Sequence, residues 1–183
     1  LGTFNPIHNG HVTLAEYFSK LSELDEVLVV ISPQSPFKKE SELISDKDRL
    51  KMAETVFKKF NNVKVSDIEF KMSRPNFTID TLKEFKKRHK YNKLILLIGE
   101  DNLVGFNKWK DYKKIIEIAE VYVYPRDTNQ RIPDEILSNN NIKLVDAPKI
   151  KISSSRIREL IKSKQNIDSL VPKEVLKFFK LNN

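Results

Sequence analysis

A short segment near the start of the chain has the residue types that phosphate chemistry needs. Residues 2–11 (GTFNPIHNGH) hold two of the four glycines and two of the three histidines in the sequence. They run directly into apolar residues at helical spacing, which predicts a loop ending at a helix N-terminus. Such a terminus favours anions because its amides and the helix dipole are partly positive. His8 and His11 can therefore face one phosphate and donate to charge that develops on it.

The competing interpretation of the two histidines is structural. Either one alone could cap the helix or pack in the interior, but Pro6 and Gly10 beside the pair favour the phosphate site. Zinc is disfavoured, because no third histidine or cysteine is placed to complete its ligand set.

A second candidate anion site lies near the other end of the chain. Residues 150–158 (IKISSSRIR) pass from a short apolar stretch into three serines and two arginines. Serine hydroxyls, helix amides and a guanidinium together favour an anion. Serines also cap helices without any ligand, so this segment alone does not predict an anion site. The prediction depends on its combination with the histidine segment. We expect the two segments to converge on one triphosphate.

The elements that must position these segments alternate along the chain. Residues 26–31 (EVLVVI) and 93–98 (KLILLI) are typical of strands buried on both faces. Further strands are predicted over residues 63–67, 121–124 and 142–145. Helices are predicted over residues 11–21, from Ser45 or Asp46 to about residue 60, and over residues 78–89, 111–119, 133–138, 154–163 and 172–180. This alternation predicts an α/β fold with a doubly wound, mostly parallel sheet and helices on both faces.

Ligands bind such a sheet beyond the carboxyl ends of its strands. The loops expected there are residues 3–10, 32–39, 99–110 and the stretch ending at Ile152, and they contain the chemically distinctive residues. Leu50, Ala53, Phe57 and Phe60 mark the apolar face of the second helix. Thr78 is expected to cap the third.

Composition limits the class of protein. A length of 183 residues, 39% hydrophobic and 32% charged, predicts one soluble domain over residues 1–183. The absence of cysteine excludes disulfides and thiol catalysis and fits a reducing, cytoplasmic compartment. No apolar run approaches the roughly 20 residues of a membrane span, and no secretion signal is recognisable.

The net charge of +8 has two explanations, a lysine-rich surface or a polyanionic partner. The lysines are scattered rather than arranged in one stripe, so charge alone does not predict nucleic-acid binding. The sequence starts at Leu1, and we expect a buried strand in the middle of the sheet to precede it.

The two outer motifs together resemble the HxGH nucleotidyltransferase superfamily, which has an HxGH loop and an SSSxxR helix start. Within it, the chain is most similar to the bacterial deamido type of nicotinate-nucleotide adenylyltransferase. Five motifs carry the resemblance: GTFNPIHNGH, SPQSPFK, NFTIDTL, LIGEDNL followed by NKW, and KISSSRIR. The outer two specify the superfamily and the middle three narrow it to this family. The resemblance implies a Rossmann-like enzyme of NAD biosynthesis that joins ATP to nicotinate mononucleotide, releasing pyrophosphate.

The resemblance also implies a role for individual residues. The catalytic set, which contacts ATP phosphates, would be His8, His11, Lys38 and Arg158, with His11 most closely tied to the transition state. The rest of the ATP site would be Gly2, Thr3, Phe4, Gly10, Gly99, Asp101, Ser154 and Ser155. The mononucleotide would contact Thr78 at its pyridine carboxylate, Trp109 at its ring and Arg126 near its phosphate.

Some of these positions also have structural interpretations. Lys38 could be a solvated lysine, Asp101 a helix cap and Trp109 a packing residue.

The chain departs from the family pattern at two positions. Asn5 stands where the family commonly has aspartate, and it can still form hydrogen bonds. Phe37 stands in place of the histidine of a PPHK segment and cannot bind phosphate.

The expected partners are ATP and nicotinate mononucleotide, with Mg²⁺ bridging phosphate oxygens and no metal ligand from the protein. Neither nucleic acid nor membrane is expected, and a homo-oligomer is compatible with the sequence. Phosphopantetheine adenylyltransferase and the cytidylyltransferases share the outer motifs, but the first commonly has threonine at position 8. Neither carries the LIGxDxL and tryptophan region. A nucleotide- or nucleic-acid-binding module that kept the fold without turnover is the alternative from another class.

Overall fold

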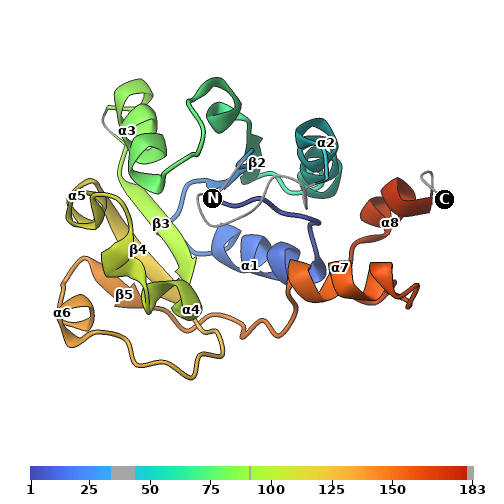
Figure 1. The fold of residues 1–183 in the computed structure, drawn as a ribbon. Helices are drawn as coiled ribbons and strands as arrows, with labels where there is room; N and C mark the ends of the chain where they lie inside the picture. Colours follow the sequence, from blue (N-terminus) through green and yellow to red (C-terminus); the bar gives the residue numbers. More distant parts are fainter. Residues whose placement is uncertain (34–43, 91, 181–183) are drawn as a thin grey trace. The chain divides into compact units, whose positions relative to one another are not determined.

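The computed structural model describes residues 1–33, 44–90 and 92–180 (Figure 1). They are α/β in class, with parallel sheets flanked by helices, as the alternation of strand and helix patterns predicts. The chain divides into two compact units, Leu1–Asn76 with Ile152–Asn183, and Phe77–Lys151. Each unit has its own sheet, and a single domain over residues 1–183 stays a prediction. Within the described residues, no helix is long and apolar enough to cross a membrane.

The first unit is built on the parallel strands β1 (Val27–Val30) and β2 (Val63–Ser66), with Val27 beside Val63. Gly2 forms a parallel bridge to Ile31, and its N–H donates to the carbonyl of Val30 at 3.0 Å. The remaining elements of this unit are α1 (Asn9–Ser19), α2 (Asp46–Phe57), the 3-10 helix η2 (Ile68–Lys71), α7 (Ser154–Lys162) and α8 (Lys173–Lys180).

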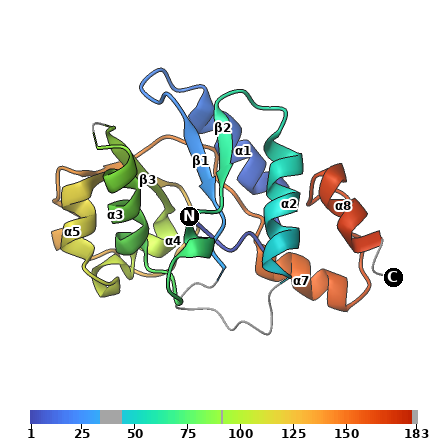
Figure 2. The same cartoon turned by 90° about the horizontal axis from the view of Figure 1, so that it is seen from above.

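The helices of this unit bury their apolar faces against the two strands and each other. α1 packs against β1 and β2, α2 packs against β2, and α8 lies beside α2 (Figure 2). The buried face of α2 is rotated from the predicted one, because Leu50 is only partly buried, and Phe60 lies beyond the end of the helix. Its fully inward residues are Arg49, Met52, Ala53, Val56 and Phe57. A charged side chain therefore occupies an inward position.

The second unit is built on three parallel strands in the order β3 (Leu94–Gly99), β4 (Ala119–Tyr124), β5 (Ile142–Leu144). Its helices are α3 (Thr78–Arg88), α4 (Glu100–Leu103), the 3-10 helix η3 (Phe106–Lys108), α5 (Tyr112–Ile118) and α6 (Asp134–Leu137). α3 and α5 pack side by side (Figure 2). Its core includes Ile79, Leu103, Phe106, Ile115 and Val121, none of which has any exposed surface.

The caps of the helices partly follow the sequence prediction. Ser45 caps α2, since its hydroxyl accepts from the N–H of Asp48 at 3.1 Å. The prediction that Thr78 caps α3 is wrong. Thr78 is already helical, and Phe77 occupies the N-cap position with extended backbone and no side-chain cap. α1 begins two residues earlier than predicted because His8 caps it.

The core of the second unit generates a stability prediction. Phe106 is fully buried, and its ring centroid lies 5.2 Å from that of Trp109. We expect Phe106→Ala to lower the free energy of unfolding by about 3–5 kcal/mol, measured by urea denaturation. Leu144→Ala, at a side chain that is 62% exposed, should change it by no more than about 0.5 kcal/mol. Equal losses in the two variants would contradict this assignment of the core.

Candidate active site

His8 and His11 cap α1 by a reciprocal pair of hydrogen bonds. Nδ1 of His8 accepts from the backbone N–H of His11 at 3.3 Å, and Nδ1 of His11 accepts from that of His8 at 3.2 Å. The two rings stack with centroids 3.6 Å apart and planes 18° apart. The structural interpretation of the histidines thus applies to both of them. It does not compete with a phosphate role, because capping uses only one nitrogen of each ring.

The caps fix which ring nitrogen carries the proton. A backbone N–H can only donate, so each Nδ1 must present a lone pair. The neutral rings therefore carry hydrogen on Nε2, which is assigned from the hydrogen bonds rather than observed. The Nε2–H of each ring is a donor of the kind that a phosphate oxygen accepts from.

Phe4 supports this ring pair from the side. Its ring stands edge-on to that of His11, with centroids 4.8 Å apart. The backbone of Phe4 has a φ of 45°, in the left-handed region that side-chain-bearing residues seldom adopt. Gly2 lies against the same ring, because a Cβ added to it would be 3.3 Å from Cε2 of Phe4. The structure thus gives Gly2 and Phe4 a packing role beside the histidines.

The three serines of the second anion segment have separate structural tasks. Ser153 is the N-cap of α7, and its hydroxyl accepts from the N–H of Arg156 at 3.2 Å. Ser154 donates instead to the carbonyl of Pro6 at 2.9 Å. Ser155 accepts from Nη2 of Arg158 at 3.3 Å. Capping therefore explains only one of the three serines.

The first and second segments meet in the folded chain. Besides the bond from Ser154 to Pro6, Nη1 of Arg158 donates to the carbonyl of Asn5 at 3.0 Å. Ser154 is 148 positions from Pro6 in the sequence, and Arg158 is 153 positions from Asn5. Both bonds lie within the first unit. Neither α1 nor α7 has an acidic residue in its first turn, so the positive end of each helix dipole is not offset there. This arrangement can accept a polyanion.

The start of α1 is also held from the C-terminal side of the chain. The backbone N–H of Asn9 donates to the carbonyl of Leu170 at 2.9 Å, and its side-chain amide donates to the carbonyl of Ser169 at 2.9 Å. Gly10, which lies between the two histidines in the sequence, is buried. The loop and helix that carry the histidines are therefore tied down on several sides.

The side chain of Asn5 accounts for the first departure from the family pattern. It is 1% exposed, and its Oδ1 accepts from the N–H of Ile44 at 2.9 Å. An amide oxygen fills this acceptor role as a carboxylate oxygen would, so the loop keeps its anchor. Lys38 and Phe37 lie outside the described residues.

In the second unit, Gly99, Asp101 and Arg126 form a cluster at the carboxyl ends of β3 and β4. A Cβ on Gly99 would lie 2.4 Å from Oδ1 of Asp101 and 2.8 Å from Cγ of Arg126, so any other residue there would force these two side chains to move. Nε of Arg126 lies 3.5 Å from Oδ2 of Asp101, and its Nη1 donates to the carbonyl of Ile150 at 3.3 Å. Asp101 is not the cap of α4, because Gly99 holds the N-cap position.

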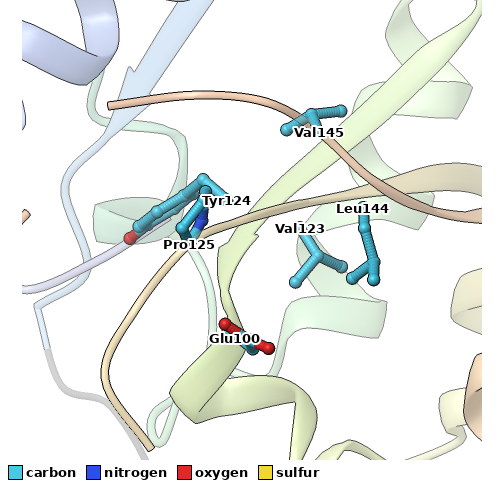
Figure 3. Close-up of a pocket in the computed structure, with 6 residues that line it drawn as sticks. All are labelled: Glu100, Val123, Tyr124, Pro125, Leu144 and Val145. Atoms are coloured by element: carbon cyan, nitrogen blue, oxygen red, sulfur yellow. The ribbon is translucent and has the colours of Figure 1, made fainter. Parts of the chain in front are cut away.

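Beside this cluster lies a small pocket of about 160 Å³ (Figure 3). It is lined by Glu100, Val123, Tyr124, Pro125, Leu144 and Val145, none of which was predicted from the sequence. Burial raises the pKa of the Tyr124 hydroxyl, and the nearby Arg126 opposes that shift. The hydroxyl therefore stays protonated at neutral pH and can donate.

Thr78 and Trp109 belong to neighbouring segments of the second unit. Lys110 joins them, since its Nζ lies 2.8 Å from Oδ2 of Asp80 and 4.7 Å from the ring centroid of Phe77. Trp109 is partly buried and packs against Phe106, so the packing interpretation holds for part of its surface. The start of α3 is thus held against the loop that carries Trp109 and Lys110, called the tryptophan loop below.

Arg49 is the functional candidate that sequence reasoning missed. It lies one turn before Met52 and Ala53, at helical spacing with the buried face of α2. The spacing could have identified it, because it places a charged residue on an apolar helix face. Such a residue is seldom buried without dedicated partners.

Comparisons with known proteins identify the family of the chain. Residues 1–160 match the cytidylyltransferase-like family. A protein of Flavobacterium johnsoniae named "Probable nicotinate-nucleotide adenylyltransferase" is 38% identical over 182 residues, covering 100% of this chain and 94% of the relative. A protein of Christiangramia forsetii with the same name is 41% identical over 177 residues, covering 97% and 91%.

A solved structure shares the fold. It is the nicotinic acid mononucleotide adenylyltransferase of Plasmodium falciparum complexed with NaAD, with a TM-score of 0.81 and 22% identity. The match covers 99% of this chain and 93% of that one. The family match places the chain in the cytidylyltransferase-like family, and the shared fold is that of a Rossmann-like nucleotidyltransferase. Within that class, the chain belongs to the nicotinate-nucleotide adenylyltransferase family.

The reciprocal cap allows its two functions to be separated. Asparagine is a strong N-cap, so His8→Asn should keep the stability of α1 while removing the Nε2–H donor. His8→Ala should lose both, with a stability cost of about 1 kcal/mol. We expect turnover to fall by roughly 10²–10³ in both variants, the scale of one lost donor to a developing charge. Thermal unfolding and steady-state kinetics measure the two effects, and normal turnover in His8→Asn would exclude a donor role.

Proposed function

We propose that the chain joins ATP and nicotinate mononucleotide to form nicotinate adenine dinucleotide and pyrophosphate, a step of NAD biosynthesis. Membership of the nicotinate-nucleotide adenylyltransferase family supports this reaction. The structural observation that carries it is the pair of bonds from Ser154 to Pro6 and from Arg158 to Asn5. These bonds join a histidine-bearing helix start to a serine–arginine helix start, which suits a triphosphate.

The proposed chemistry is displacement at the α-phosphorus of ATP. A phosphate oxygen of the mononucleotide forms the new P–O bond, and the bond between the α-phosphorus and its bridging oxygen breaks. The electron pair of that bond leaves with pyrophosphate. The nucleophile is already ionised at neutral pH, so no general base is required. Catalysis is then positioning and neutralisation of charge.

We assign the groups of the first unit to the triphosphate. The Nε2–H groups of His8 and His11 would donate to its oxygens, with His11 nearest the charge that develops during transfer. Ser155 and Arg158 would bind the β- and γ-phosphates, since an arginine pairs well with phosphate. Gly2, Thr3, Phe4, Gly10 and Ser154 would shape the backbone of this site. Lys38, which lies outside the described residues, stays a predicted phosphate ligand.

We assign the groups of the second unit to the nucleotide groups. Gly99 and Asp101 would contact the ATP nucleotide at the end of β3. Thr78 would receive the pyridine carboxylate, Trp109 would stack on the pyridine ring, and Arg126 would lie near the mononucleotide phosphate. The contact of Lys110 with Asp80 and Phe77 supports the joint assignment of Thr78 and Trp109.

Mg²⁺ is part of the proposal as an ion bound to phosphate oxygens of the substrate. Within the described residues, no group of three histidine, aspartate or glutamate side chains is placed to hold a metal ion. In this proposal the ion is held by the triphosphate and water, which is common for Mg²⁺. It would neutralise charge on the phosphates, and the protein groups above would orient them.

The proposal includes two small-molecule substrates and neither nucleic acid nor membrane as a partner. We also propose a cytoplasmic location, which the proposed role in NAD biosynthesis and the cysteine-free sequence support. Assembly into a homo-oligomer stays a prediction.

The reaction is tested by pyrophosphate release with ATP, Mg²⁺ and one acceptor at a time. We expect turnover with nicotinate mononucleotide, and none with phosphopantetheine or without an acceptor. Identification of the dinucleotide product by mass spectrometry completes the test. Turnover with phosphopantetheine and silence with nicotinate mononucleotide would overturn the proposal.

Lys110→Met tests the mononucleotide side. Loss of the contact with Asp80 should loosen the start of α3 against the tryptophan loop. We expect the KM for nicotinate mononucleotide to rise roughly two- to fivefold, the scale of a surface ion pair, with the KM for ATP unchanged. Arg131→Met, which removes another exposed ion pair 2.7 Å long, is the matched control. An equal rise in both variants would refute the assignment.

A further inference from the structure

Arg49 has no exposed surface, and all of its hydrogen-bonding capacity is used within the first unit. A guanidinium has five N–H donors in a fixed plane. Here five hydrogen bonds are formed: from Nε to the carbonyl of Ile44 (2.9 Å), from Nη1 to the carbonyls of Thr3 (2.8 Å) and Ser32 (2.6 Å), and from Nη2 to the carbonyl of Pro33 (3.0 Å) and Oδ1 of Asp46 (2.5 Å). Each donor therefore has an acceptor.

Burying such a group is costly, and the sequence nevertheless keeps it on the inward face of α2. Burial lowers the pKa of Arg49, and the carboxylate of Asp46 opposes that shift. An apolar side chain would fill the same space without that cost. It would also remove the donors that four backbone carbonyls accept from, which points to those carbonyls as the reason for an arginine.

The carbonyls belong to segments that have no regular structure to hold them. Thr3 lies in the loop that leads to His8, Ser32 and Pro33 follow β1, and Ile44 precedes α2. Asn5 adds a second tie between the same loop and Ile44 through its side-chain oxygen. The carbonyl of Asn5 in turn accepts from Arg158. One continuous set of bonds thus runs from α2 through the loop to α7.

We propose that Arg49 is a positioning residue for adenylyl transfer, which fixes the backbone of residues 3–5 so that His8, His11 and Arg158 keep their places at the triphosphate. This inference rests on the proposed function. Displacement of a catalytic group by about 1 Å can lower a rate by up to roughly 10²-fold, so an anchor without substrate contact can matter for turnover.

A purely structural role makes a different prediction. It would lower stability and leave the turnover of the folded fraction unchanged. Arg49→Lys separates the two, because one ammonium nitrogen has three donors and cannot reach four carbonyls and a carboxylate. Val56→Ala is the matched control, since Val56 is a fully buried aliphatic residue of the same helix.

Kinetics are measured on both variants well below their unfolding midpoints. We expect both to unfold at lower temperature, but only Arg49→Lys to lose kcat, by about tenfold or more. Equal kcat losses in the two variants, or no loss in Arg49→Lys, would overturn the inference.

A second pair of variants serves if Arg49→Lys does not fold. Asp46→Asn keeps the guanidinium and removes the charge of its only carboxylate partner in the described residues, so we expect a smaller fall in kcat. Asp46 also binds Arg74 at 2.5 Å, so Arg74→Gln controls for that partly exposed bridge and should keep kcat. Unchanged kcat in Asp46→Asn, or the same loss in Arg74→Gln, would overturn the inference.

A spectroscopic readout separates this inference from the proposed function. Long-range ¹H–¹⁵N correlation spectra of the substrate-free protein report the tautomers of His8 and His11. We expect Nε2–H tautomers in the unaltered chain and in Val56→Ala, and altered imidazole shifts in Arg49→Lys. If the unaltered chain is inactive with nicotinate mononucleotide but the imidazole spectra still differ in this way, the proposed reaction is rejected. The role of Arg49 as an anchor is then still supported. Identical imidazole spectra in all three proteins would overturn the anchor whatever the activity.

Discussion

The backbone carbonyls of the loop before α1 are held by side chains from distant helices, and the rest of the site depends on this. A loop that forms no sheet or helix must find partners for its polar backbone elsewhere. Arg49 of α2 provides one for Thr3, and Arg158 and Ser154 of α7 provide them for Asn5 and Pro6. Because these bonds fix the path of the loop, they also fix where α1 begins and where its histidines stand.

The arrangement allows the same residues to have a structural role and, in the proposed reaction, a chemical one. His8 and His11 use Nδ1 to complete the end of a helix, and the proposed function assigns Nε2–H of each ring to the triphosphate. Arg158 donates through Nη1 to Asn5 and through Nη2 to Ser155, which sets its guanidinium across the loop and the helix start. An anion at this place would meet donors whose directions are set before it arrives. Preset donors of this kind require little reorganisation during reaction.

The sequence allowed the alternation of strands and helices, and hence the α/β class, to be predicted because buried strands and amphipathic helices have distinct periods. The meeting of the two anion segments was also predictable, since both combine a helix start with residue types that bind phosphate. The cap of α3 was not, because Thr78 and Phe77 differ by one position and only backbone geometry decides between them. Which of three adjacent serines caps α7 was equally undetermined.

Arg49 shows the limit of pattern reasoning most clearly. Its buried position follows from its spacing with Met52 and Val56, yet a periodic pattern cannot name the carbonyls that it satisfies. Those partners come from residues 3, 32, 33 and 44, which are brought together only when the strands and α2 have packed. Local sequence contains no record of such long-range pairing.

The stacked imidazoles have one more consequence, for how this protein can change by mutation. Each ring needs the backbone of the other, so replacing either one alters the hydrogen bonding of its neighbour as well as its own. Free-energy effects at residues that share partners are not additive. The two positions are therefore coupled during evolution: a single exchange leaves half a cap unless the new side chain supplies its own acceptor.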